Sequence, residues 1–110
     1  MKLLFAIVQN EDVKRLTRSL SADGYSITKI STTGGFLQGG NSTLMMGVED
    51  DGLEHALELI KKASSIRKQY VSAPQASMPG LAPEVMGAPI QVTVGGAVVF
   101  ITEVYRFLRF

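Results

Sequence analysis

Apolar and polar positions fall into blocks that predict a regular succession of strands and helices. The first block, from Leu3 to Val8, is a continuous apolar run bounded by polar residues, which is typical of a central strand covered on both faces. The next apolar residues recur at helical spacing: Val13, Leu16 and Leu20. We therefore expect a strand followed by a helix that begins near Glu11.

Polar residues and a glycine mark the ends of that helix. Asn10 or Asp12 is expected to cap its first turn, and Gly24 is expected to end it in the left-handed conformation. Tyr25 to Thr33 is rich in β-branched residues and predicts a strand, and Leu44 to Val48 predicts the next one. The segment between these strands contains two Gly-Gly pairs, so we expect a hairpin with an elaborated tip.

A second helix is expected to open at residues 50–52 and to run to about Gln69. Its apolar residues repeat at helical spacing: Leu53, Ala56, Leu57, Ile60 and Ala63. All four prolines lie in the stretch that follows, which predicts a long loop over residues 70–89. Residues 90–94 and 97–104 are then expected to pair as a second hairpin about Gly95-Gly96.

This order of elements, β-α-β-β-α-β-β, predicts an α+β fold of the ferredoxin-like class, βαββαβ plus an extra strand. The 110 residues suffice for a single domain, 1–110. Two helices can cover only one face of such a sheet. The other face needs cover of its own, which favours a closed ring of subunits packed through their sheets.

Composition supports a self-associating, nearly neutral protein. Hydrophobic residues make up 45% of the chain and charged residues 19%, which is an apolar excess for a soluble surface. A net charge of +1 provides no field to drive binding to a nucleic-acid polymer or a membrane. No secretory signal or membrane-spanning run is predicted, so we expect a cytoplasmic protein.

The residues that catalysis requires are scarce. His55 is the sole imidazole, and its place beside Glu54 in the first turn of the second helix favours a solvent-exposed role. Asp50 and Asp51 are better explained by a charged turn that opens a helix than by an acid-base or cation site. The chain has no cysteine and no phosphate-loop motif. The sequence therefore predicts no catalytic residue, no metal site and no cofactor.

Binding chemistry is concentrated in the glycine-rich hairpin. Glycine lets the backbone approach a ligand closely, and consecutive N–H groups can hold phosphate oxygens without a cationic side chain. Phe36 offers an aromatic face to a base, Asn41 a donor and an acceptor for an adenine edge, and Thr28 a hydroxyl. These are the parts of a nucleotide site. The alternative is that the glycine pairs only shape a tight turn.

The C-terminal segment YRFLRF, residues 105–110, allows two interpretations. Tyr105, Phe107 and Phe110 are suited to packing in the core or at an interface. Arg109 instead offers a guanidinium fork that matches an anionic ligand.

Four segments, in this order and spacing, carry a family resemblance: TTGGFLQGGNST, GVEDD, the Pro-, Gly- and Met-rich loop, and VGGAVVF. Over essentially the whole chain, they resemble the PII-like cyclic di-AMP receptor proteins. The resemblance implies a homotrimer with the fold of PII signal proteins, which binds cyclic di-AMP in clefts between subunits. It implies a sensor that acts on an unknown protein target and is not an enzyme.

The same resemblance assigns residues to the site. Thr28, Gly35, Phe36 and Leu37 would line the cleft from one side, Asn41 and Gly47 would lie near an adenine, and Phe100 would contribute at the subunit boundary.

Three positions depart from the family pattern. Receptors of this type often carry arginine where this chain has Ser26 and Gln38, and a glutamine near their terminus is replaced here by Arg109. Arg109 restores the lost positive charge, or the ligand differs. The alternative function is therefore an orphan PII-like trimer that binds another adenine nucleotide or serves as a protein-interaction scaffold.

Overall fold

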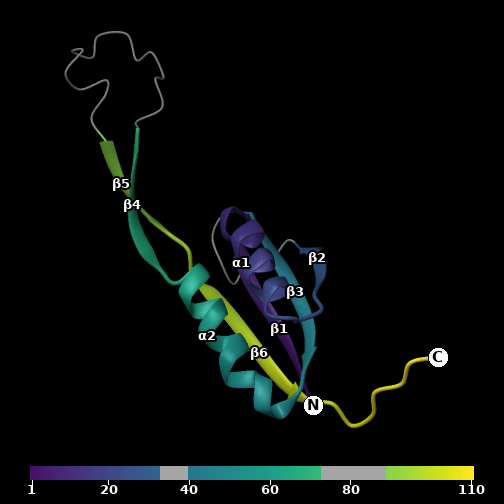
Figure 1. Ribbon diagram of the computed structural model, residues 1–110. Coiled ribbons are helices and arrows are strands. Elements are labelled where there is room, and N and C mark those ends of the chain that lie inside the picture. Colours follow the sequence, from purple (N-terminus) through teal and green to yellow (C-terminus); the bar gives the residue numbers. More distant parts are fainter. Residues whose placement is uncertain (33–39, 73–88) are drawn as a thin grey trace, which may run out of the picture.

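The computed structural model describes residues 1–32, 40–72 and 89–110, which form two helices, a short 3-10 turn and six strands (Figure 1). In chain order these are β1 (Lys2–Gln9), α1 (Asn10–Ala22), β2 (Thr28–Thr32), β3 (Asn41–Val48), η1 (Asp50–Gly52), α2 (Leu53–Ser64), β4 (Arg67–Ser72), β5 (Pro89–Val94) and β6 (Ala97–Glu103).

Four strands form the main sheet in the order β2-β3-β1-β6, and every neighbouring pair is antiparallel. Both helices lie against one face of this sheet (Figure 1). The fold is therefore the expected α+β, ferredoxin-like arrangement, with β6 as its fourth strand. The extra strands, β4 and β5, form a separate two-stranded sheet.

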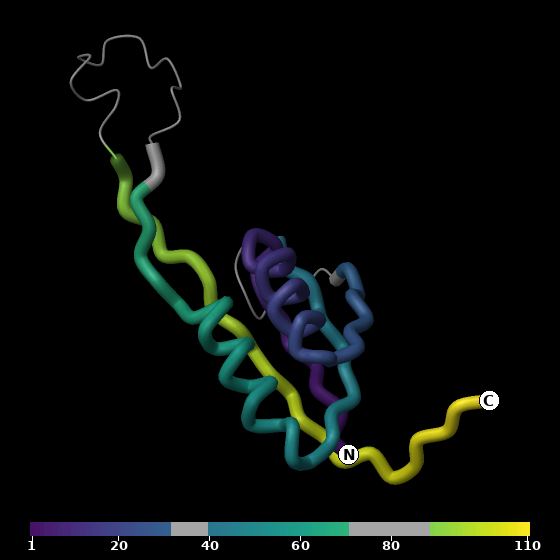
Figure 2. The backbone as a smooth tube through the Cα atoms, in the orientation of Figure 1, coloured from purple at the N-terminus to yellow at the C-terminus, as the bar shows by residue number. Residues whose placement is uncertain are grey.

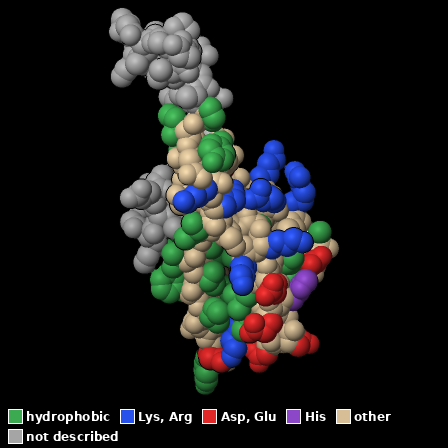
Figure 3. Space-filling model, turned by 90° about the vertical axis from the view of Figure 1, so that its left-hand side faces the viewer, with side chains coloured by type: hydrophobic (Ala, Val, Ile, Leu, Met, Phe, Trp, Pro, Cys, Tyr) green, Lys and Arg blue, Asp and Glu red, His purple; other side chains and the backbone are tan. Residues whose placement is uncertain are grey.

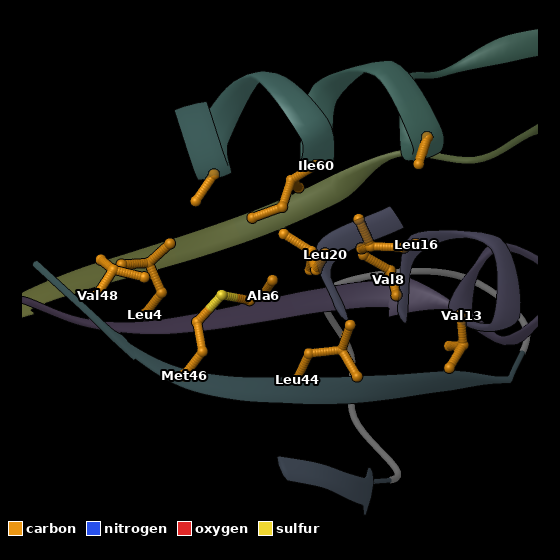
Figure 4. Packing of buried hydrophobic residues seen from close by; sticks show 12 residues of the cluster. Leu4, Ala6, Val8, Val13, Leu16, Leu20, Leu44, Met46, Val48 and Ile60 are labelled. Carbon is orange, nitrogen blue, oxygen red and sulfur yellow. The ribbon is translucent and has the colours of Figure 1, made fainter. Parts of the chain in front are cut away.

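The core lies between the sheet and the two helices (Figure 4). Side chains alternate between the two faces of a strand, so every second residue of β1 and β3 points at the helices. The buried members of these strands and helices include Leu4, Val8, Leu16, Leu20, Leu44, Met46 and Ile60. The expected core stripes of both helices are confirmed.

The two ends of α1 follow different rules. Gly24 has φ +89°, the left-handed conformation expected just after the helix. The predicted cap is wrong, because α1 begins at Asn10 without a side-chain cap. The side chains of Asn10 and Asp12 have tertiary partners instead: the Ser42 hydroxyl donates to Asn10, and arginines donate to Asp12.

Helix α2 ends at Ser64, so the expected end near Gln69 is wrong. The hydroxyls of Ser64 and Ser65 donate back to carbonyl oxygens of the last helical turn, which competes with continued helix. Ser65 has ψ 148°, and the chain leaves it in extended conformation to become β4.

The second predicted hairpin is also wrong. Strand β5 pairs with β4, whereas β6 pairs with β1 in the main sheet. Gly95 and Gly96, at φ +84° and +100°, thus carry the chain from one sheet into the other. Of the expected loop 70–89, the two ends belong to β4 and β5, and residues 73–88 lie outside the described residues.

Strands β4 and β5 form an arm that projects away from the main sheet (Figures 1 and 2). The C-terminal residues after β6 also leave the body, beside the N-terminus (Figure 2). Tyr105, Phe107 and Phe110 are exposed, so none of them packs in the core of this chain.

Charges are unevenly distributed despite the near-zero net charge. Lysine and arginine gather in a band below the arm, and aspartate and glutamate gather at the far end (Figure 3). Helix α2 shows this polarity, with Glu54 in its first turn and Lys61 and Lys62 in its last. No helix of the described residues is long and apolar enough to cross a membrane.

Candidate functional site

The face of the main sheet opposite the helices, here called the open face, carries the candidate site. Residues that pair directly across antiparallel strands point to the same face. One row of such residues crosses all four strands: Thr28 of β2, Met45 of β3, Phe5 of β1 and Phe100 of β6. This row contains two predicted site residues, Thr28 and Phe100, at its opposite ends.

Two further predicted residues, both on β3, belong to other rows of the same face. Gly47 pairs with Leu3, and Asn41 pairs with Gln9 and Thr32. Because Asn41, Met45 and Gly47 are separated by even numbers of residues, they point the same way along β3. Four predicted site residues, distant in sequence, are thus brought to one face of one sheet.

These four residues differ in accessibility. Thr28 and Gly47 are exposed, and Phe100 on the edge strand β6 is 48% exposed, which is a large exposed fraction for a phenylalanine. Asn41 is only 6% exposed. The open face therefore offers a hydroxyl, a bare stretch of backbone and an aromatic ring to a ligand, with the Asn41 amide buried at its end.

Gly47 is not required by the conformation of its own strand. It is not among the positive-φ glycines of the described residues, and an added Cβ would meet only Met1 Sδ, at 3.7 Å. The fold of a single chain thus tolerates a side chain here. A glycine at an exposed sheet position is typical of a place where a ligand or another backbone approaches closely.

The remaining predicted residues are not brought to this face by the described chain. Gly35, Phe36 and Leu37 lie outside the described residues. Arg109 is exposed in the segment that leaves the body after β6.

Sequence reasoning missed the apolar centre of the open face. Phe5 and Met45 occupy the middle of the row between Thr28 and Phe100, and both are half-buried. The signal was present, because the first apolar run fills both faces of its strand. It was interpreted only as the mark of a central strand.

Two polar clusters on the helix side, one around His55 and one around Asp12, have structural partners. His55 Nε2 lies 2.6 Å from Asp23 Oδ2 in an exposed pair, which confirms its solvent-exposed role. Among the described residues, no three His, Asp or Glu side chains form a group that could hold a metal ion.

Asp12 is the one fully buried carboxylate of the described chain, and it joins α1 to the root of the arm. Its Oδ1 accepts from Arg67 Nη2 at 2.7 Å and from Arg15 Nη2 at 2.9 Å. The pKa of Arg67 is raised chiefly by its hydrogen bond to Asp12, with the charges of Asp12 and Glu11 acting in the same direction against burial. These groups fix the arm and do not face the candidate site.

The described residues thus form a ferredoxin-like domain with both helices on one side of the sheet and a mixed polar and aromatic open face on the other. The chain belongs to the cyclic-di-AMP receptor family, whose model matches residues 1–110. It is also similar to a solved structure titled as a functionally unknown protein from Pediococcus pentosaceus ATCC 25745. The two share 41% sequence identity and a TM-score of 0.78, over 99% of this chain and 96% of that one.

Proposed function

We propose that this protein is a non-catalytic signal-transduction protein that binds cyclic di-AMP in clefts between the subunits of a homotrimer. Ligand binding reorders its loops and so changes the surface that a protein target contacts, in the cytoplasm. Membership of the cyclic-di-AMP receptor family supports the ligand. The observation that carries the inter-subunit site is the position of Thr28 and Phe100 on the open face.

Thr28 and Phe100 lie on the two edge strands of the sheet, with β3 and β1 between them. Neighbouring strands are about 4.8 Å apart, so three spacings separate the two residues by roughly 14 Å. One adenine ring cannot contact both within a single subunit. If the β6 edge of one subunit adjoins the β2 edge of the next, the two residues meet in one cleft.

The open face also requires a partner for physical reasons. Its apolar members come from all four strands: Leu3, Phe5, Ile7, Ile30, Met45, Val98 and Phe100. Burial of this area in a closed ring removes it from water and leaves no apolar surface exposed for further association. A trimer thus covers the apolar centre of the face and leaves its polar margins for the ligand.

The residues at those margins suit a cyclic dinucleotide. Exposed backbone at Gly47 allows close approach of the ligand, and the Thr28 hydroxyl can donate to or accept from it. Phe100 presents an aromatic ring for stacking. Phe36, which we assign to the same cleft from the sequence, provides the second aromatic face.

Isothermal titration calorimetry with cyclic di-AMP, ATP and cyclic di-GMP tests the ligand. We expect binding of cyclic di-AMP, and we expect Phe36→Ala to weaken it by about 1 to 3 kcal/mol through lost base stacking. The matched control is Phe107→Ala, which removes an exposed aromatic ring from the C-terminal segment. Indifference of the protein to all three nucleotides would end the proposal, and an unchanged affinity of Phe36→Ala would place the base elsewhere.

Ser26 and Gln38 favour a second candidate, an orphan trimer that binds another adenine nucleotide or serves as an interaction scaffold, because they replace two arginines common in receptors of this type. The same titration separates the two. Binding of ATP without binding of cyclic di-AMP would select the second candidate.

A further inference from the structure

A groove of about 520 Å³ lies between α1 and the edge strand β2, on the helix side of the sheet. Its charged and polar lining residues are Asn10, Lys14, Thr17, Arg18, Ser21 and Lys29. Among the residues that the structure describes, no acidic side chain lines it. We propose that this groove is a second ligand site, which binds a small soluble anion that carries two linked phosphate groups.

The groove is separate from the open face. Thr28 and Lys29 are consecutive in β2, so their side chains point to opposite sides of the sheet. Thr28 pairs with Met45 on the open face, whereas Lys29 pairs with Leu44, which is fully buried beneath the helices. The same edge strand thus borders the candidate cyclic di-AMP site on one side and this groove on the other.

Three cationic side chains converge on the groove without a carboxylate partner. Lys14 and Arg18 are one helical turn apart on α1, and Lys29 of β2 lines the same groove. None of the three forms an ion pair with another described residue, whereas Lys2, Arg15 and Arg67 all do. Like charges four residues apart disfavour a helix, and a bound anion reverses that effect.

A buried hydroxyl supplies an independent indication of a ligand. Thr17 Oγ1 is inaccessible to solvent and has no hydrogen-bond partner among the described residues. A buried polar group without a partner is uncommon in folded proteins, because it loses its bonds to water. Thr17 lines the groove between Lys14 and Arg18, and rotation about its χ1 would turn the buried hydroxyl toward the groove, where it can donate to an anionic oxygen.

The arrangement selects a diphosphate over a single charge. Lys14 and Arg18 belong to one helix and Lys29 to the facing strand, so the positive charges of the lining come from both sides of the groove. Hydroxyls of Thr17 and Ser21 add neutral donors along the same helix stripe. Two linked phosphate groups present enough oxygens to accept from several of these donors at once.

Inorganic pyrophosphate is the probe, titrated into the full chain by calorimetry and by amide chemical shifts. We expect the largest shifts in α1 and β2. The double variant Lys14→Gln/Arg18→Gln should bind pyrophosphate at least about tenfold more weakly, since charge-assisted hydrogen bonds are lost. The matched control Lys61→Gln/Lys62→Gln removes the same charge from the last turn of α2 and should stay within about twofold.

Thr17→Val tests the hydroxyl separately, because it keeps the shape of the side chain. It should weaken pyrophosphate binding several-fold, on the order of one lost hydrogen bond, while the unfolding midpoint of the free protein does not fall. If Lys14→Gln/Arg18→Gln and Lys61→Gln/Lys62→Gln lost pyrophosphate affinity equally, the binding would be non-specific electrostatic attraction, and the proposal would be overturned. Amide shifts confined to the open face would overturn it as well.

The groove site does not depend on the proposed function. Each of the two sites can be refuted by an experiment that leaves the other intact. Cyclic di-AMP affinity should be unchanged within about twofold in Lys14→Gln/Arg18→Gln, because these side chains lie on the other side of the sheet. A protein that binds pyrophosphate in the groove and ignores cyclic di-AMP would uphold this site and reject the first one.

Discussion

At the scale of single residues, Asp12 shows how one buried carboxylate organises a region of the molecule. Its side chain is fully buried, while those of Arg67 and Arg15 are 35% and 58% exposed. Burial of a lone carboxylate is costly, so Asp12 depends on both guanidinium groups. Arg15 also donates to the Ala63 carbonyl at the end of α2, so this cluster joins α1, α2 and β4.

We predict that Asp12→Asn lowers the free energy of unfolding by about 2 kcal/mol, since it leaves two arginines without their counter-charge in a partly exposed setting. Urea unfolding measures this. Asp23→Asn is the matched control, because Asp23 pairs with His55 at the surface, and it should cost less than about 0.5 kcal/mol. Similar losses in the two variants would contradict the assignment.

Titration of Arg67 does not change the stability of the protein at neutral or mildly alkaline pH. The folded-state pKa of Arg67 is raised above its usual value, so its stabilising effect is complete below the unfolded pKa and is lost only as pH rises through the folded one. That window lies in strong alkali. Stability should therefore show no loss from Arg67 between neutral and mildly alkaline pH.

At the scale of elements, Gly95 decides where the arm ends and the main sheet resumes. It has φ +84°, and its N–H donates to Gln9 Oε1 at 2.6 Å. A Cβ on Gly95 would collide with the Ser65 carbonyl oxygen and would lie 2.6 Å from Arg67 Nη1. Backbone geometry and lack of space thus both require glycine here.

We predict that Gly95→Ala destabilises the protein by about 3 kcal/mol, from an unfavourable φ together with a clash against backbone. Gly24→Ala is the matched control, since Gly24 has φ +89° but nothing within 4 Å of an added Cβ. It should cost only about 1 kcal/mol. Thermal unfolding compares the two, and equal costs would show that the crowding at Gly95 is unimportant.

The elements also show where local pattern stops being informative. The helical stripe of α2 predicted its core residues correctly, but not its end at Ser64. The strands β5 and β6 were located correctly, yet they pair with β4 and β1 and not with each other. Pairing depends on which neighbours the folded chain brings together, and a Gly-Gly dipeptide permits both a tight turn and a change of sheet.

At the scale of the whole molecule, the open face carries apolar residues that no other part of the described chain covers. Phe100 is 48% exposed in a row whose centre is Phe5 and Met45. The aromatic residues after β6 are exposed as well. A subunit with these surfaces uncovered has a strong tendency to associate.

We predict that the protein in solution has three times the 11.9 kDa mass of one chain, and that Phe100→Asp dissociates it by placing a charge at the boundary between subunits. Light scattering measures both. Ile101→Asp is the matched control, because Ile101 is 45% exposed and points to the helix side of the same strand. Circular dichroism verifies that both variants remain folded. A native chain with the mass of one subunit would refute the trimer.

The sequence by itself determined the approximate positions of both helices and of every described strand except β4, together with the core stripes, the fold class and the family, because all of these follow from local periodicity and from short motifs with fixed spacing. It also named Thr28, Asn41, Gly47 and Phe100 as site residues, without showing that they share a face. Only the tertiary structure decided that, since strand register sets which side chains align across a sheet. It alone also revealed the groove beside Lys29, because its lining comes from two elements that meet only in the folded chain.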